Sequence, residues 1–82
     1  MNHWFVYVLS MKNWKYYVWS TTDLKRRIIQ HQYGKVKSTK HLIPVWLVYS
    51  RQYTTIKEAR QMEYWLKKQR DRKQIERFMQ GF

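Results

Sequence analysis

The chain has 82 residues, and 17 Lys and Arg against 5 Asp and Glu give it a formal net charge of +12 at pH 7. Hydrophobic residues make up 44% of the sequence and aromatic residues 18%, which excludes a disordered tail and predicts one folded domain over residues 1–82. Cysteine is absent, which excludes disulfides and thiolate zinc sites and fits a cytoplasmic protein.

Two strand segments at hairpin distance open the chain. Trp4–Leu9 is continuously apolar, which predicts a strand covered on both faces; it is too short to span a membrane. Lys15–Ser20 is the predicted return strand, after a turn at residues 11–13 in which Asn13 takes the left-handed conformation. This three-residue loop sets the expected cross-strand pairs, which are Ser10 with Trp14, Tyr7 with Tyr17, and Phe5 with Trp19. We therefore expect the two tyrosines to be neighbours on one face of the sheet.

A basic helix is predicted next. Thr22 is the expected N-cap, the helix runs from Asp23 to Tyr33, and Gly34 is a natural residue to follow its end. Arg27 and His31 lie one turn apart and flank the apolar stripe of this helix within about 60° on a 3.6-residue wheel. Both side chains are therefore expected to point toward the sheet.

The rest of the chain is expected to add one strand and two helices. A basic loop over Lys35–Leu42 leads to a third strand over Val45–Tyr53. Thr55 caps a second helix that ends at about Arg70, and a short third helix covers Arg72–Met79 before a frayed end at residues 81–82. The predicted fold class is α+β, with a three-stranded antiparallel sheet flanked by helices in the order β-β-α-β-α-α.

A carboxylate falls on the predicted buried stripe of the second helix. The stripe is formed by Ile56, Ala59, Met62 and Leu66, which recur at helical spacing. Glu63 lies on it, and burying a carboxylate is costly unless it is paired or binds a metal. A pair with Arg60 or Lys67, one turn away on either side, is the ordinary alternative.

A charge of +12 on so small a chain attracts polyanions, and nucleic acid is the partner that this charge favours. The residues expected to bind its backbone are Lys35, Lys37, Lys40, His41, Lys67, Arg70 and Lys73. A solubilising surface and an anionic membrane are alternatives, but no long helix with one purely apolar face favours the membrane, so we expect none.

The order of these motifs resembles the GIY-YIG nuclease family. The sequence has Phe5-Val6-Tyr7, then Tyr17-Val18-Trp19, then the helix that carries Arg27 and His31, and later Glu63. The resemblance covers residues 4–79 and looks closest to the small stand-alone bacterial branch, which is related to the nuclease domain of UvrC and to a resolvase subunit.

The resemblance implies a metal-dependent endonuclease that hydrolyses phosphodiester bonds in DNA, such as branched or nicked DNA, without strong sequence specificity. Tyr7 and Tyr17 would be the motif tyrosines, one of them a general base, and His31 would assist proton transfer or orient a tyrosine. Arg27 would bind the scissile phosphate, and Glu63 would hold one Mg²⁺ or Mn²⁺. Each residue alone has an ordinary structural explanation, and only their joint order favours catalysis.

The sequence also departs from the family pattern. Phe5 and Trp19 replace the glycines of the two motifs, and an indole beside the active face either fills space or offers a base-stacking platform. Met11, Trp14 and Trp19 would add apolar surface near the hairpin end. The alternative function is therefore a GIY-YIG scaffold with weak or no catalysis that binds a protein, a second copy of itself or nucleic acid.

Overall fold

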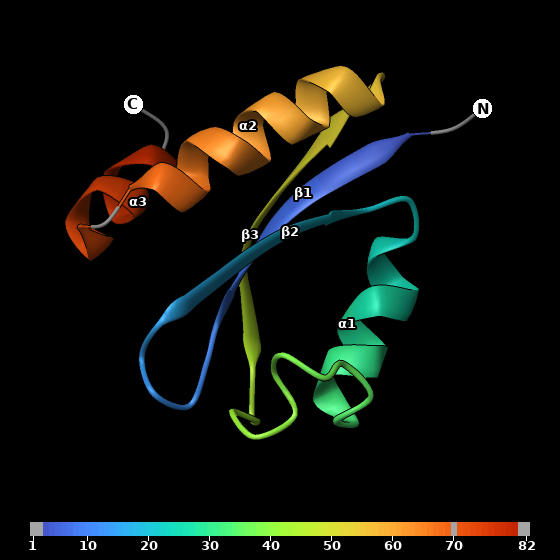
Figure 1. Ribbon diagram of the computed structural model, residues 1–82, viewed down its shortest axis with the longest axis vertical. Coiled ribbons are helices and arrows are strands. Elements are labelled where there is room, and N and C mark those ends of the chain that lie inside the picture. Colours follow the sequence, from blue (N-terminus) through green and yellow to red (C-terminus); the bar gives the residue numbers. More distant parts are fainter. Residues whose placement is uncertain (1–2, 70, 81–82) are drawn as a thin grey trace.

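A computed structural model describes residues 3–69 and 71–80. The element order confirms the predicted α+β fold, with β1 (Trp4–Ser10), β2 (Tyr16–Thr21), α1 (Leu24–Gln32), β3 (Trp46–Tyr53), α2 (Ile56–Lys68) and α3 (Arg72–Met79). The sheet order is β2-β1-β3, and both pairings are antiparallel. Figure 1 shows α1 on one side of this sheet and α2 with α3 on the other. No helix of the described residues is long and apolar enough to cross a membrane.

The central strand β1 is covered on both faces, as its continuous apolar sequence predicts. Side chains point alternately to the two faces of a strand, so β1 contributes to two cores. On the side of α2 and α3 the core contains Val6, Val8, Val18, Ala59 and Leu66. On the side of α1 it contains Tyr7, Leu9, Met11 and Val45. The two motif tyrosines belong to the α1 side, with Tyr17 packed against that second core.

The predicted hairpin register is wrong by two residues. Tyr7 pairs with Trp19, Leu9 with Tyr17, and Phe5 with Thr21. The expected pairs Ser10–Trp14, Tyr7–Tyr17 and Phe5–Trp19 are therefore not formed. Because the shift is even, every side chain keeps its predicted face.

A longer turn causes the register shift. Residues 11–15 connect the strands, with the Met11 N–H donating to the Lys15 carbonyl over 3.0 Å and the Trp14 N–H donating to the Met11 carbonyl over 2.9 Å. Trp14, and not Asn13, takes the left-handed conformation, with φ of 68°. The Asn13 side chain instead accepts the Lys15 N–H over 3.1 Å, so its polar group stabilises the turn without the special backbone angle.

The helix ends follow the predicted chemistry with one correction. Asp23, and not Thr22, caps α1, because its carboxylate accepts the Arg26 N–H over 3.2 Å. Gly34 follows the C-terminus of α1 with φ of +71°, as predicted. Thr55 caps α2, again as predicted. The predicted end of this helix at Arg70 lies outside the described residues, as does the predicted frayed end at residues 81–82, and α2 itself ends at Lys68.

The buried face of α2 is shorter than its periodicity predicts. Ile56 is 38% exposed, whereas Ala59 and Leu66 are buried. Ile56 is the first residue of α2, so the periodic stripe begins one turn before the side chains that reach the core. Glu63 follows Met62 on the partly buried flank of this helix, which directs its carboxylate toward β2.

Candidate active site

A buried polar network links β1, α1 and the loop that follows α1. The Tyr7 hydroxyl lies 2.9 Å from His31 Nε2, and His31 Nδ1 lies 2.8 Å from Thr39 Oγ1. All three residues have no exposed surface. Sequence reasoning predicted that His31 points toward the sheet but missed Thr39, since a hydroxyl in a polar loop carries no periodic signal.

Burial and one nearby cation determine the charge states of this network. Burial raises the pKa of Tyr7 to about 12, although hydrogen bonding from the neighbouring Arg27 guanidinium opposes the shift. Burial, together with the positive charge of Arg27, lowers the pKa of His31 to about 4. At neutral pH the pair therefore consists of a protonated phenol and a neutral imidazole.

In front of this network lies an open cavity of about 680 Å³. Its lining residues are Tyr17, Trp19, Arg27, Val36, Lys37 and Ser38. The Tyr17 ring lies edge-on to His31, with ring centroids 5.1 Å apart, and the Ser38 hydroxyl donates to the Tyr17 hydroxyl over 3.4 Å. Tyr17 and Arg27 thus line the cavity, whereas Tyr7 and His31 lie buried behind it. This separation gives the two tyrosines different surroundings.

Glu63 lies on the other side of β2, and each oxygen of its carboxylate contacts a neighbouring side chain. Ser20 Oγ donates to its carboxylate over 2.7 Å, and Lys67 Nζ binds the second oxygen at 2.8 Å. The ordinary pairing expected from the sequence, with Lys67 one turn away, is therefore formed. A second cavity, of about 510 Å³, lies beside Glu63. It is lined by Trp4, Trp19, Ser20, Arg60, Glu63, Tyr64 and Lys67.

Trp19 forms a wall of both cavities. Its indole stacks on Tyr17 with ring centroids 6.1 Å apart and an interplanar angle of 24°. On the other side, Lys67 Nζ lies 3.6 Å from the centroid of the Trp19 ring. The residue that replaces the motif glycine therefore stands between Arg27 and Glu63 and contacts the residues beside each. This arrangement supports the prediction that an indole here fills space near the site.

Glu63 supplies one carboxylate of the kind that a hard cation uses when it keeps most of its own water. No three His, Cys, Asp or Glu side chains gather at one point in residues 3–69 and 71–80. Mg²⁺ is often held by only one or two carboxylates together with water and substrate phosphate. Glu63, with its side chain 16% exposed and the Ser20 hydroxyl adjacent, supplies one such ligand.

The residues predicted to bind nucleic acid differ in their exposure and in their contacts. Lys35, Lys37, Lys40 and His41 are exposed in the connection between α1 and β3, and Lys73 is exposed on α3. Only Lys37 of these lines a cavity described above. Lys67 is held by Glu63 and Trp19, and Arg70 lies outside the described residues.

The predicted apolar surface at the hairpin end is smaller than expected. Met11 is only 6% exposed because it belongs to the core on the α1 side, so its assignment to an interface is wrong. Trp14 is 70% exposed and Trp19 is 42% exposed. The Trp14 carbonyl accepts a hydrogen bond from the Arg72 guanidinium, which ties the hairpin end to α3.

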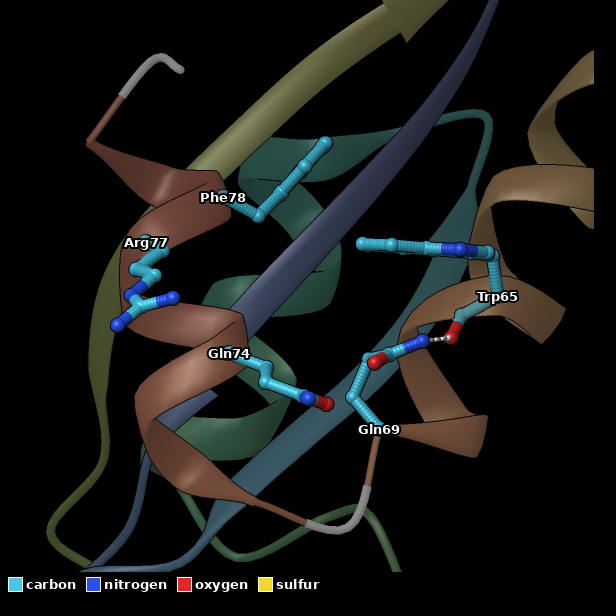
Figure 2. Close-up of a pocket in the computed structure, with 5 residues that line it drawn as sticks. All are labelled: Trp65, Gln69, Gln74, Arg77 and Phe78. Carbon is cyan, nitrogen blue, oxygen red and sulfur yellow. Dashed lines mark hydrogen bonds between the residues drawn. The ribbon is translucent and has the colours of Figure 1, made fainter.

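Trp65 is 43% exposed and lies at a groove remote from the two motif tyrosines. Figure 2 shows Trp65 of α2 and Gln69, the residue after α2, facing Gln74, Arg77 and Phe78 of α3 around a cavity of about 700 Å³. The Trp65 and Phe78 rings lie 5.4 Å apart between centroids, so one aromatic contact forms part of its wall. Phe78 packs on the core on the α2 and α3 side, which places this groove on the sheet face opposite Tyr7 and Tyr17.

Comparison with known proteins identifies the family. Residues 3–76 match the GIY-YIG catalytic domain. The chain belongs to the GIY-YIG family. All five residues predicted to act in catalysis lie within the matched range. The match indicates a nuclease-type function, which implies a nucleic-acid substrate, and the relatives below agree with the predicted small bacterial branch.

Bacterial GIY-YIG relatives carry the name UPF0213. The chain is 37% identical over 76 residues to a UPF0213 protein of Streptococcus pneumoniae serotype 4, across 92% of this chain and 76% of that one. It is 40% identical over 68 residues to the UPF0213 protein YazA of Bacillus subtilis, across 82% of this chain and 69% of that one. The solution NMR structure of a UPF0213 protein from Bacillus halodurans matches with a TM-score of 0.63 and 36% identity, across 98% of this chain and 84% of that one. This structural match agrees with the fold described above.

Proposed function

We propose that the protein is a metal-dependent endonuclease that hydrolyses phosphodiester bonds in DNA. It selects its cleavage sites by DNA structure, such as a nick or branch, more than by DNA sequence. The observation that carries the proposal is the cavity in which Arg27 and Tyr17 lie together in front of the buried Tyr7–His31 pair. The net charge of +12 supports binding to a polyanion.

Phosphate binding is assigned to the mouth of this cavity. Arg27 and Lys37 supply positive charge at its wall, and the Ser38 hydroxyl supplies a further donor. The Arg27 guanidinium has a planar fork of donors that fits phosphate oxygens. Because charge builds up on those oxygens in the pentavalent transition state, Arg27 stabilises the transition state more than the bound substrate.

The two tyrosines take different roles because their exposure differs. Tyr17 lines the cavity, so it is the tyrosine that contacts the attacking water. Tyr7 has no exposed surface and bonds to His31, so it positions the groups behind the cavity. Of the two candidates for general base that the sequence leaves open, the geometry therefore favours Tyr17.

Glu63 is the residue that would hold the ion, one Mg²⁺ or Mn²⁺. When bound, such an ion polarises the phosphate and stabilises the leaving oxygen. The Glu63 carboxylate can serve as its ligand only after the Lys67 ammonium, now 2.8 Å away, has moved. Ser20 remains as a hydroxyl donor that orients the carboxylate.

The test is cleavage of nicked, branched and linear DNA by the purified protein with Mg²⁺ or Mn²⁺. We expect Arg27→Ala and Glu63→Gln each to lower the cleavage rate by about 10²–10³-fold while most DNA binding survives. Arg26→Ala is the matched control, because it removes the same charge from an exposed position on the same helix and should keep near-normal activity. If neither the wild type nor Trp19→Gly cleaves any of these substrates, the proposal is wrong.

The position of Trp19 favours a second candidate, a nucleic-acid-binding GIY-YIG scaffold whose site is closed. The indole separates the cavity of Arg27 from that of Glu63, and one phosphodiester must reach both residues to be cut. Cleavage by Trp19→Gly but not by the wild type would decide for this candidate. Cleavage by both would decide for the endonuclease.

A further inference from the structure

We propose that Thr39 is a positioning residue that fixes the tautomer of His31 and thereby the direction of the Tyr7 hydroxyl behind the Arg27 cavity. This inference deepens the proposed function, since it assigns a role to a residue that contacts neither substrate nor metal. It rests on a continuous set of buried contacts, with Tyr7 to His31 at 2.9 Å and His31 to Thr39 at 2.8 Å.

The direction of each hydrogen bond follows from the available donors and acceptors. The Tyr7 hydroxyl has no exposed surface, so its proton needs an acceptor inside the protein. Its hydrogen-bond partner is His31 Nε2, and the Arg27 guanidinium, whose charge also acts on Tyr7, has donors only. Nε2 must therefore accept the Tyr7 proton. Because a neutral imidazole carries a single proton, that proton lies on Nδ1 and is donated to Thr39 Oγ1.

The neutral state of His31 is supported by its surroundings. The imidazole is buried, and the Arg27 cation is near enough to disfavour a second positive charge. With the Tyr7 proton directed at Nε2, the lone pairs of the Tyr7 oxygen point away from the imidazole. Thr39 thus acts on Tyr7 through one intermediate side chain, His31.

The loop holds Thr39 firmly enough for this role. Val36, the buried anchor of the loop, accepts backbone hydrogen bonds from Thr39 over 3.0 Å and from Lys40 over 2.9 Å. The Thr39 carbonyl accepts the Leu42 N–H over 2.9 Å, so the backbone is bonded on both sides of the residue. A fixed hydroxyl that orients an imidazole is the same arrangement by which outer partners fix histidine tautomers at metal sites.

The experiment uses a matched pair of variants. Thr39→Val replaces the hydroxyl with a methyl group of nearly equal size, and Thr39→Ser keeps the hydroxyl. The readout is the imidazole ¹⁵N chemical shifts of His31 at pH 7 in the full chain, with His3→Gln and His41→Gln substitutions in all samples to leave one histidine. In the reference protein and in Thr39→Ser, we expect the His31 proton to lie on Nδ1 alone. In Thr39→Val, we expect the Nδ1-protonated tautomer to be no longer the only one populated.

A cleavage assay with the same variants gives the second readout. Thr39→Val is expected to lower kcat by about 10–100-fold with little change in KM, and Thr39→Ser should restore most of it. A proton on Nε2 in the reference protein overturns the inference even if Thr39→Val does not fold. An unchanged tautomer in Thr39→Val also overturns it, and so does equal cleavage by the two variants. If no protein cleaves, the proposed function fails, while the NMR result still decides the role of Thr39.

Discussion

Lys67 is the residue whose removal tests most directly whether Glu63 can serve a metal ion. Its ammonium occupies the position at which a cation would meet the carboxylate, 2.8 Å from Glu63 and 3.6 Å from the Trp19 ring centroid. An ion pair one helical turn apart is worth about 0.3–0.5 kcal/mol, and an exposed cation–π contact about 0.5–1 kcal/mol. Since the Lys67 side chain is 38% exposed, the lower ends apply, and displacement costs about 1 kcal/mol in all.

Lys67→Met should therefore bind Mn²⁺ about fivefold more tightly than the wild type, because the metal no longer displaces an ammonium. Free Mn²⁺ measured by electron paramagnetic resonance during a titration without nucleic acid gives the dissociation constant directly. Glu63→Gln should abolish the binding in either background, which shows that the measured site is the one described.

Lys68→Met is the matched control for this experiment. It removes the same charge from the neighbouring residue, whose Nζ lies 4.8 Å from the Tyr64 ring centroid. Removing any positive charge favours a cation over long range, so a small gain is expected in both variants. An equal gain in both, or no gain in Lys67→Met, refutes the reasoning that Lys67 competes with the metal for Glu63.

Two further predictions concern stability and are checked by urea denaturation. Because the pKa of His31 is lowered from 6.5 to about 4, the unfolded chain takes up its proton first as the pH falls. The contribution of His31 to the free energy of unfolding should be complete above pH 6.5, and up to about 3 kcal/mol of it should be lost as the pH falls toward 4. His31→Gln should reduce this loss. Within the described part of the chain, Gly34 and Trp14 have positive φ, and substitutions at these two residues should have opposite effects. Gly34→Ala should cost about 1 kcal/mol in backbone strain alone, because the nearest side-chain atom would be 3.9 Å from the new Cβ. Trp14→Gly should gain about 0.5 kcal/mol, the left-handed penalty less the added entropy of glycine. An acid loss that His31→Gln leaves unchanged, or a Trp14→Gly variant less stable than the wild type, contradicts these assignments.

The sequence was sufficient for the elements because each has a strong local signal. The apolar run of β1, the cap at Thr55 and the glycine after α1 act within a few residues, and the structure confirms all three. The register depended on which turn residue takes the left-handed conformation. General preference favours Asn13, but its side chain bonds to the Lys15 N–H, while Arg72 of α3 binds the Trp14 carbonyl. A contact between residues far apart in sequence cannot be predicted from the propensities of the turn.

The same distinction applies to the site. Arg27 and His31 were predictable because they share a helix and lie one turn apart, as do Glu63 and Lys67. Thr39 was not, because its partner lies on another segment and a loop threonine resembles any other. Met11 was misplaced for a related reason. Its position near a hairpin end suggested exposure, but the residues after α1 cover it in the folded chain, with Leu42 and Ile43 packed on the same core.

An even register shift keeps each side chain on its predicted face but changes its cross-strand partner, and Trp19 shows the consequence. The tyrosines kept their faces, so the group around Arg27 formed as expected, but the indole moved from opposite Phe5 to opposite Tyr7. Opening the wall between the two cavities requires Trp19 to leave Tyr17 and Lys67. A stacked aromatic pair is worth about 0.5–1.5 kcal/mol and the cation–π contact about 0.5–1 kcal/mol. A cost of about 1–2.5 kcal/mol leaves the open form populated at about 1–15 per cent, so the closed arrangement would slow the proposed phosphodiester cleavage without forbidding it.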